Sequence, residues 1–192
     1  SKRSGLQDYP SLLTGLYPSP FDFQHQLMYL IPQDGREWKK NDQGYVDYAY
    51  SVIRDSILSS GGGALVLFTS FAMMNEVYER VAEDIGKDME LLLQNQNTSR
   101  HVLLNRFKTN EDSSLFATAS FWEGIDAPGN TLRLVIIVKL PFEVPSDPIY
   151  MARSSYIDQH SDRGSFMTLT VPNAVIKMKQ GVGRLIRNEE DK

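Results

Sequence analysis

The sequence predicts an α/β fold with a mainly parallel sheet and helices on both faces. Short, nearly unbroken apolar runs alternate along the chain with segments that have helical spacing, and this alternation is typical of β-α-β folds. The runs lack the apolar–polar alternation of a half-exposed strand, so we expect strands buried on both faces. The expected strands are residues 27–31, 64–70, 89–94, 114–120 and 132–140, and the expected helices are 45–60, 71–85, 98–110, 147–160 and 172–187.

The elements of the first half have clear start and stop signals. The run "LMYLI" is ended by Pro32, which suits a short strand, and the polar stretch after it predicts a loop. The helix over 45–60 stops at three glycines, and the next helix ends at Gly86. Between these two helices, residues 64–70 form an apolar run that ends in hydroxyls. The apolar face of the first of these helices consists of Val46, Ala49, Ile53 and Ile57.

The second half continues the same alternation. The helix over 98–110 begins with a good capping residue, 114–120 reads as another buried strand, and 132–140 is the most hydrophobic run of all. Polar residues directly follow three of the runs, in "FTSF", "ASFWEGID" and "KLPF". Because the carboxyl ends of parallel strands meet at one edge of a sheet, we expect these polar ends to lie together.

Composition limits the possible functions. The 192 residues suit one domain, and 41% hydrophobic and 23% charged residues are typical of a globular protein. No apolar run reaches about 18 residues and no signal-peptide core is present, so a cytoplasmic location is the default expectation. With no cysteine, a disulfide framework and a cysteine-ligated metal are excluded from this segment. A net charge of −4 means that a nucleic-acid role would rely on few charges and more on hydroxyls and backbone amides.

The stretch "QGVGRLIR" places two arginines next to two glycines on a predicted helix. Gln180, Arg184 and Arg187 fall at i, i+4 and i+7, on one face. Gly181 and Gly183 leave the flank of that face bare for a close approach. Guanidinium groups held in this way suit bidentate contact with phosphate, whereas the alternative is a solvated basic face paired with nearby acids. The opposite, apolar face consists of Val175, Met178, Val182 and Leu185.

A second unusual stretch, "SFWEGIDAPGN", follows the strand expected at 114–120. Glu123 and Asp126 bracket Gly124, and carboxylates in this place could hydrogen-bond a ribose or orient an arginine. The alternative is a turn that only connects two strands. Trp122 is either part of the core or a stacking platform for a base.

Other patterns carry less information. The glycines of "SGGGALVLFTS" precede a strand and no Lys-Ser/Thr pair follows them, so they do not form a phosphate loop. His25, His101 and His160 are far apart in the sequence and show no zinc-type spacing, and we expect His160 in a surface loop. No G-x-S-x-G motif supports a hydrolase nucleophile.

Taken together, "ALVLFTSF", "SLFATASFWEGIDAPGNTLRLVIIVKLPF" and "PNAVIKMKQGVGRLIRNEED" resemble helicase motifs IV, V and VI of the second motor domain of DinG/XPD-like superfamily 2 helicases. "PSPFDFQHQLMYLIP" is similar to the segment with which that domain begins. The resemblance implies that residues 1–192 are a second, RecA-like motor domain, a three-layer sandwich of a mainly parallel sheet between helices. It also implies that residues 1–25 are a lead-in segment and that the family's final strand follows residue 192.

The resemblance implies an ATP-driven motor that moves 5′→3′ on single-stranded DNA. ATP with Mg²⁺ would lie between this domain and an N-terminal motor domain of the same polypeptide, which carries the phosphate loop and the Mg²⁺ ligands. The isolated chain is therefore expected to hydrolyse no ATP. The roles that the resemblance implies are catalytic for Gln180, Arg184 and Arg187, ATP-binding for Glu123, Gly124, Asp126 and Gly183, and DNA-binding for Thr69, Ser70, Ser120 and Trp122.

Three other interpretations are open. A non-catalytic module could keep the helicase-like fold and bind only nucleic acid or a protein, although such a binder has no use for an arginine pair that faces a cleft. The chain could instead be the helicase-like half of a DinG-type nuclease. An unrelated Rossmann-like enzyme is the third, and no cofactor fingerprint supports it.

Overall fold

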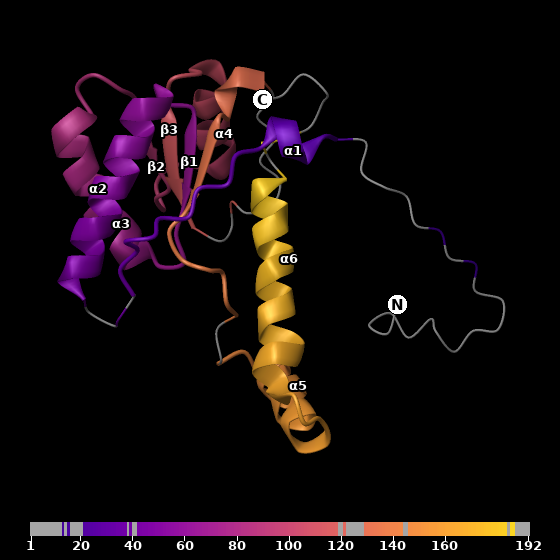
Figure 1. Ribbon diagram of the computed structural model, residues 1–192. Helices are drawn as coiled ribbons and strands as arrows, with labels where there is room; N and C mark the ends of the chain where they lie inside the picture. Colours follow the sequence, from indigo (N-terminus) through magenta and orange to yellow (C-terminus); the bar gives the residue numbers. More distant parts are fainter. Residues whose placement is uncertain are drawn as a thin grey trace.

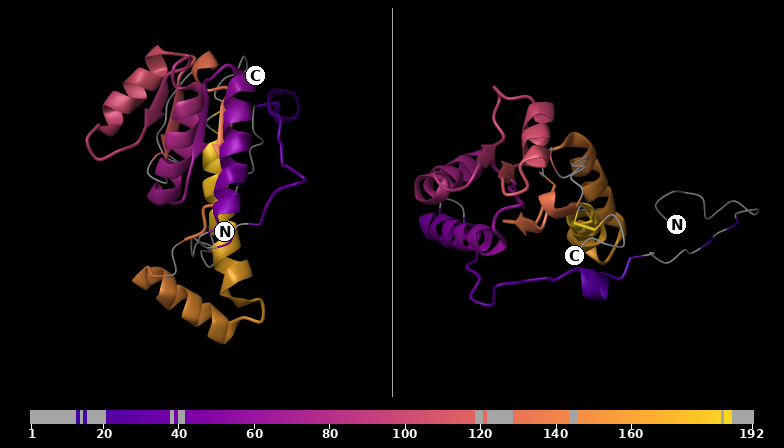
Figure 2. Two further views of the ribbon diagram at one scale, coloured as in Figure 1. Left: turned by 90° about the vertical axis from the view of Figure 1, so that its left-hand side faces the viewer. Right: turned by 90° about the horizontal axis from the view of Figure 1, so that it is seen from above.

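A computed structural model of the chain shows a four-stranded parallel sheet with helices on both faces (Figures 1 and 2). The strands lie in the order β2-β3-β1-β4. This confirms the predicted α/β class. The strands are β1 (Ala64–Leu67), β2 (Leu91–Leu93), β3 (Ser114–Ala117) and β4 (Leu134–Ile137). The structure describes residues 13, 15, 21–37, 39, 42–118, 121, 129–143, 146–183, 185 and 186.

The helices begin and end near the predicted signals. Asp42, Ser99 and Asp147 each accept a hydrogen bond at the start of a helix from a backbone N–H of the first turn, and Gly61 ends α2 in the left-handed conformation. The α-helices are α1 (Phe23–Gln26), α2 (Gln43–Ser60), α3 (Phe71–Ile85), α4 (Arg100–Thr109), α5 (Pro148–His160) and α6 (Val171–Val182). A 3-10 turn, η4 (Gly129–Thr131), precedes β4, and a π-helix, η5 (Phe166–Thr170), leads directly into α6.

Two hydrophobic clusters lie on opposite faces of the sheet. The side chains of β1 alternate between them: Val66 packs with α2 and α3, and Leu65 packs with α4. Strands β1 and β3 are fully buried, as expected for central strands. Strand β4 is only partly buried although it is the most hydrophobic run, because it pairs with β1 alone among the described strands.

The three glycines after α2 form a tight turn at the amino edge of the sheet. Gly61, Gly62 and Gly63 all have positive φ, which L-residues with a side chain rarely adopt. A Cβ on Gly62 would lie 2.0 Å from the backbone oxygen of Asp112, so only glycine fits there. Arg133 closes this edge by donating to the carbonyl oxygen of Gly61 at 2.8 Å. The glycines are therefore a structural turn, which agrees with the sequence argument against a phosphate loop.

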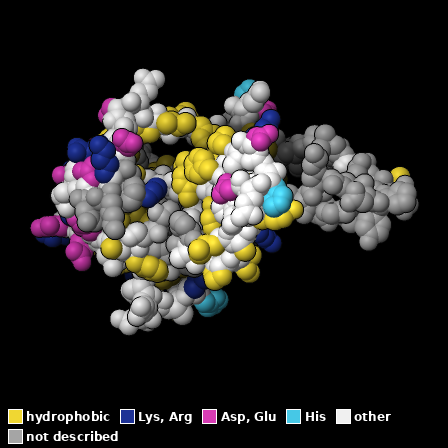
Figure 3. Space-filling model, turned by 90° about the horizontal axis from the view of Figure 1, so that it is seen from below, with side chains coloured by type: hydrophobic (Ala, Val, Ile, Leu, Met, Phe, Trp, Pro, Cys, Tyr) yellow, Lys and Arg dark blue, Asp and Glu magenta, His cyan; other side chains and the backbone are white. Residues whose placement is uncertain are grey.

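Helices α5 and α6, joined through η5, project from the sheet as an arm (Figures 1 and 2). The arm is tied to the segment after β4, because Glu143 accepts from Asn173 at 3.1 Å and pairs with Lys177 at 3.6 Å. Figure 3, which views the molecule from below, shows hydrophobic side chains around the middle of this face and most charged side chains on the side of α2 and α3. The exposed hydrophobic residues of the arm include Ile149, Met151, Tyr156, Phe166, Met167, Val175 and Ile176.

The strand predicted at residues 27–31 is wrong. These residues form no strand, and their larger side chains are exposed, as shown by Met28 at 79% and Ile31 at 83%. The run has strand composition, but a strand needs a hydrogen-bonded neighbour, and none of the described strands pairs with it. His160 also differs from the prediction, because it ends α5 and stacks on Tyr156 instead of lying in a loop.

The helix predicted at 172–187 is partly wrong. It ends at Val182, because the C-cap residue Gly183 has a non-helical ψ of 0°, although its N–H still donates to the carbonyl oxygen of Lys179 at 2.8 Å. Leu185 and Ile186 lie beyond the helix, and the two arginines of the predicted helix, Arg184 and Arg187, lie outside the described residues. The predicted apolar face is only partly confirmed: Val175 is 38% exposed, whereas Met178 and Val182 are half-buried and Leu185 packs against a hydrophobic cluster. The fully buried residues of α6 are Ala174 and Gly181.

Candidate functional site

The carboxyl ends of β1, β3 and β4 meet at one edge of the sheet. Strand β1 lies between the other two, in register with both along Ala64–Leu67. The ladder continues past the strand ends, because Phe68 N–H donates to the carbonyl oxygen of Ala117 at 2.9 Å and Val138 N–H donates to that of Leu67 at 3.1 Å. Thr69 and Ser70 therefore leave the sheet between two other strand ends, as the sequence predicted.

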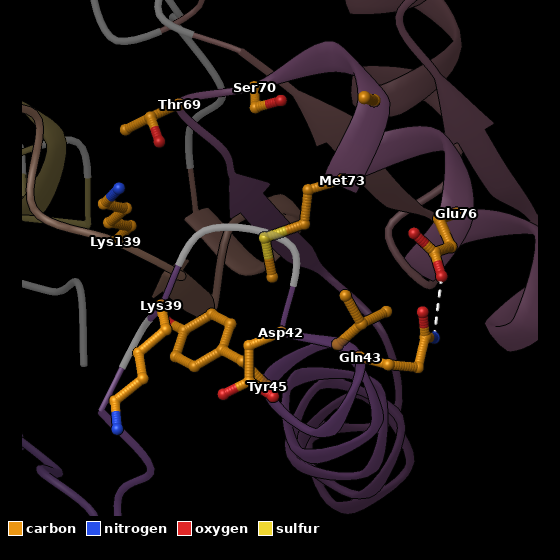
Figure 4. Close-up of a pocket in the computed structure, with 11 residues that line it drawn as sticks. Lys39, Asp42, Gln43, Tyr45, Thr69, Ser70, Met73, Glu76 and Lys139 are labelled. Atoms are coloured by element: carbon orange, nitrogen blue, oxygen red, sulfur yellow. Dashed lines mark hydrogen bonds between the residues drawn. The ribbon is translucent and has the colours of Figure 1, made fainter.

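A pocket of about 370 Å³ opens beside these two residues (Figure 4). Its walls come from the ends of β1 and β4 and from the first turns of α2 and α3. Figure 4 shows Thr69, Ser70 and Lys139 at one end, while Gln43 and Glu76 lie toward the other. The lining residues are Lys39, Asp42, Gln43, Tyr45, Val46, Thr69, Ser70, Ala72, Met73, Glu76 and Lys139.

A hydrogen bond to the residue before Lys139 fixes the backbone on this side of the pocket. The hydroxyl of Tyr45 on α2 donates to the carbonyl oxygen of Val138 at 2.6 Å, which ties α2 to the end of β4. Burial raises the pKa of the Tyr45 hydroxyl, so this donor keeps its proton at neutral pH. Burial also lowers the pKa of the Lys139 ammonium group, because the charged form loses hydration there.

The carboxylates of the pocket are engaged with other groups. Asp42 caps α2 through Gly44 N–H at 3.0 Å and also accepts from Arg36 at 3.3 Å. Glu76 accepts a 2.8 Å hydrogen bond from Gln43, which links α3 to α2 (Figure 4). The pocket thus has hydroxyls and a lysine at one end, and its two carboxylates, Asp42 and Glu76, are already hydrogen-bonded.

A hydrogen-bonded clip fixes the chain where it leaves β3. Gln94, after β2, accepts from the backbone N–H of Thr118 at 2.7 Å and from its hydroxyl at 3.0 Å. Phe121 N–H then donates to the carbonyl oxygen of Thr118 at 2.9 Å. The Phe121 ring is 1% exposed, and Arg100 of α4 lies 5.2 Å from its centroid. Thr118 and Phe121, which precede the predicted ATP-facing residues, are therefore held by these contacts.

The end of α6 meets the same part of the molecule. Leu185 packs into the hydrophobic cluster that contains Phe121 and Leu132, on the α4 face of the sheet. Ile186 is also buried. The chain after Gly183 therefore returns to the sheet next to the residues that flank 122–128, while Gln180 stays exposed on the last turn of α6.

The structure places four of the predicted site residues. Thr69 and Ser70 line the pocket, Gln180 lies on the last turn of α6, and Gly183 caps that helix. Lys139 had no predicted role, although the polar end of "KLPF" after an apolar run was a signal that could have identified it. The other predicted residues lie outside the described part of the chain: Ser120, Trp122, Glu123, Gly124, Asp126, Arg184 and Arg187.

Residues 53–192 match the family model described as the helicase C-terminal domain. The chain belongs to this helicase C-terminal domain family. The domain is 38% identical over 194 residues to the ATP-dependent DNA helicase YoaA of Escherichia coli, and the match covers 100% of this chain and 29% of YoaA. It is 38% identical to the ATP-dependent DNA helicase DinG of Photobacterium profundum, with 99% of this chain and 28% of that protein covered. The resemblance to DinG-like helicases is thus confirmed.

A third relative of this helicase C-terminal domain has a different name. The 3'-5' exonuclease DinG of Bacillus subtilis is 32% identical, with 100% of this chain and 21% of that protein covered. The domain therefore spans less than a third of the length of these curated relatives. The solved structure named XPD_APO superposes with a TM-score of 0.54 over 77% of this chain and 29% of that chain, at 20% identity, so it shares the fold.

Proposed function

We propose that the chain is the second motor domain of a DinG-type ATP-dependent DNA helicase and that it works with an N-terminal motor domain of the same, longer polypeptide. One observation carries this proposal. Phe121 and Leu185, which stand next to the two predicted ATP-facing stretches, pack in one hydrophobic cluster. This packing supports the proposal that the two stretches, more than 60 residues apart in the sequence, share one edge of the domain, where a second domain can close over them.

In this proposal Arg184 and Arg187 reach the γ-phosphate across the cleft and Gln180 organises the same site. Glu123 and Asp126 face the nucleotide. Gly124 and Gly183 permit close approach. An arginine that arrives only on closure stabilises the charge that develops on the transferred phosphoryl group, and such an arginine is worth roughly 10³–10⁵ in rate.

The DNA side of the proposed motor uses the strand ends. Thr69, Ser70, Ser120 and Trp122 form part of a track for single-stranded DNA, on which the motor moves 5′→3′. Hydroxyl donors and one aromatic platform suit a chain with a net charge of −4, because they hold a strand without many cations. Closure of the cleft changes the grip on the strand, so that hydrolysis is converted into stepping.

ATP binds together with Mg²⁺ in this proposal. Among the described residues, no group of three or more His, Cys, Asp or Glu side chains could hold a metal ion. By resemblance to DinG/XPD-like helicases, we assign the Mg²⁺ ligands and the phosphate loop to the N-terminal motor domain, and we expect the isolated chain to hydrolyse no ATP. No helix in the described part of the chain is both long and apolar enough to cross a membrane, and we place the protein in the cytoplasm.

The proposal is tested by ATP hydrolysis in the full-length parent, with and without single-stranded DNA. Arg187→Ala should lower the DNA-stimulated rate a hundredfold or more, which corresponds to about 3 kcal/mol of transition-state stabilisation. Arg153→Ala removes an exposed arginine from the arm and should leave the rate unchanged. Equal rates for Arg187→Ala and wild type would mean that the arginine only belongs to a basic surface, and a non-catalytic binding module would then be the better assignment.

The name of the Bacillus relative supports a second candidate function, the helicase-like half of a nuclease-bearing DinG. The two candidates differ in what the full-length parent does to a labelled, partly duplex DNA in the presence of ATP. A helicase releases the intact labelled strand, whereas a nuclease shortens it from the 3′ end. Appearance of shortened products without strand release would favour the second candidate.

A further inference from the structure

The segment that follows β4 contacts the arm at two points. The ring of Phe142 lies 5.8 Å from the ring of Phe166 in η5, measured between the ring centroids. The next residue, Glu143, contacts α6 with both oxygens of its carboxylate. Its Oε2 accepts a hydrogen bond from the side-chain amide of Asn173 at 3.1 Å, and its Oε1 lies 3.6 Å from the Nζ of Lys177. One carboxylate therefore bridges two side chains of the same helix.

These two side chains lie on the face of α6 that carries Gln180. Asn173, Lys177 and Gln180 fall at i, i+4 and i+7 within the helix, and this spacing places them on one face. At a rise of about 1.5 Å per residue, Lys177 precedes Gln180 by about 4.5 Å along the helix axis. Glu143 thus contacts this face one turn before the residue to which the proposed function assigns a role in catalysis.

The backbone that carries Glu143 is attached to the sheet. Val138, five residues earlier, donates from its N–H to the carbonyl oxygen of Leu67 at 3.1 Å and accepts at its own carbonyl oxygen from the hydroxyl of Tyr45 at 2.6 Å. The short connection from Val138 to Glu143 therefore relates the position of α6 to the carboxyl edge of the sheet.

Two contacts to one helix face determine how that face is turned. A single contact would let α6 rotate about its axis, whereas contacts to Asn173 and Lys177 together oppose both rotation and sliding. The side chains of Glu143 and Lys177 are 29% and 41% exposed, so the ion pair itself adds little stability. The contribution that we assign to the bridge is orientation, because a displacement of about 1 Å at a reacting group can lower a rate about a hundredfold.

We propose that Glu143 is a positioning residue for ATP hydrolysis: by bridging Asn173 and Lys177, it sets the rotation of α6 and thereby the direction in which Gln180 meets the nucleotide. The inference rests on the proposed function and deepens it with a residue that touches no substrate. Its loss should affect the reacting phosphate more than the binding of ATP, because the group that it positions acts on the γ-phosphate.

A second glutamate of the chain provides a matched control. Glu90 accepts a hydrogen bond from Asn110 at 2.9 Å and pairs with Arg106, so it also bridges two side chains that are four residues apart. Its side chain is 28% exposed, against 29% for Glu143. Glu90 directly precedes β2, which lies at the opposite end of the described sheet from β4. Glu90→Ala therefore removes a similar bridge far from α6.

Steady-state ATP hydrolysis by the full-length parent, with saturating single-stranded DNA, tests the proposal. Glu143→Ala should lower kcat about tenfold and leave the KM for ATP unchanged, because it misplaces a group that acts in the transition state. Glu143→Gln keeps an oxygen for Asn173 and loses only the charge pair with Lys177, so it should lower kcat about threefold. Glu90→Ala should leave both constants unchanged.

The decisive readout is the coupling between Glu143 and Gln180. Residues that act as a unit have effects that do not multiply, so Glu143→Ala should lower kcat by less than about twofold when Gln180→Ala is already present. A purely structural role would lower kcat by the same factor in both backgrounds. If Glu143→Ala does not fold, the same comparison with Glu143→Gln decides.

The possible outcomes separate this inference from the proposed function. Thermal unfolding midpoints should fall by similar amounts in Glu143→Ala and Glu90→Ala, so that a difference in kcat does not reflect a difference in stability. A wild-type kcat in the Glu143 variants, or a loss that multiplies with that of Gln180→Ala, would overturn the positioning role. The motor proposal would then still stand if Arg187→Ala lowers the rate. If Arg187→Ala also keeps the wild-type rate, the proposed function fails as well.

Discussion

At the start of β3, two neighbouring serines are buried in different ways. Ser113 donates from its hydroxyl to the carbonyl oxygen of Asn110 at 2.7 Å, whereas the hydroxyl of Ser114 is buried without a hydrogen-bond partner. A buried polar group without a partner costs about 1–3 kcal/mol, because it gives up its hydrogen bonds to water.

This difference gives opposite predictions for the same substitution. Ser114→Ala should leave the free energy of unfolding unchanged or raise it by about 1 kcal/mol, because an unsatisfied group is removed. Ser113→Ala should lower it by about 1 kcal/mol, because a made hydrogen bond is lost. Urea denaturation of the chain measures both, and a marked loss of stability in Ser114→Ala would show that its hydroxyl does have a partner.

At the scale of an element, the glycine turn between α2 and β1 leads to a prediction about stability. Gly62→Ala should cost well over 2 kcal/mol, because a left-handed conformation and a clash with the Asp112 backbone add together. Gly129→Ala is the matched control: it also has positive φ, but nothing lies within 4 Å of its added Cβ. The control should cost only about 1–2 kcal/mol. Similar thermal unfolding midpoints for the two variants would contradict the clash.

Helices α2 and α3 are joined by charged side chains that should respond to pH. The pKa of Asp84 is lowered, first by the hydrogen bond from Tyr50 and then by that from Arg54. A carboxyl with a lowered folded-state pKa stabilises the fold above its unfolded pKa of about 3.9, and that stability is lost as pH falls through the lower folded value.

We therefore expect Asp84→Asn to be less stable than wild type near neutral pH and the gap to close as pH falls below about 4. Chemical denaturation at a series of pH values measures the gap. Glu79→Gln changes an exposed carboxylate on the same helix and should show no such dependence. A gap for Asp84→Asn that is constant from pH 7 to 3 would mean that ionisation of this carboxyl does not contribute.

At the scale of the whole molecule, the strands predicted from the sequence agree with the structure in the centre of the sheet. The apolar runs that contain β1 and β3 can be recognised as strands from the sequence, because both faces of each strand must be hydrophobic. The run at 27–31 has the same composition but lies exposed, since pairing depends on a neighbour that composition does not reveal. The partial burial of β4 was missed for the same reason: its place at the end of the described sheet depends on strand order.

Some residues of the candidate site could be predicted from the sequence, and others could not. Thr69 and Ser70 were identified because hydroxyls directly follow a buried strand, and the structure places both in a pocket. Lys139 was missed although it directly follows an apolar run, because its place in the pocket depends on a contact across 93 residues, between Tyr45 and Val138. The helical spacing from Gln180 onward misled, because Gly183 ends the helix and periodicity cannot be read through such a cap.

Strand order also has a consequence for the synthesis of this protein. Strand β1 is an interior strand of the sheet, and its Ala64 pairs with Ser114 on one side and with Leu134 on the other. These partners come 50 and 70 residues later in the chain. At roughly 5–20 residues per second, a ribosome needs several seconds to make the first of these partners. The run "ALVLF" therefore leaves the ribosome 50 residues ahead of its first partner strand, and until that strand follows neither of its edges is paired. The newborn chain is therefore most open to wrong association at its own centre, and a chaperone that shields this run would protect the step on which the rest of the sheet depends.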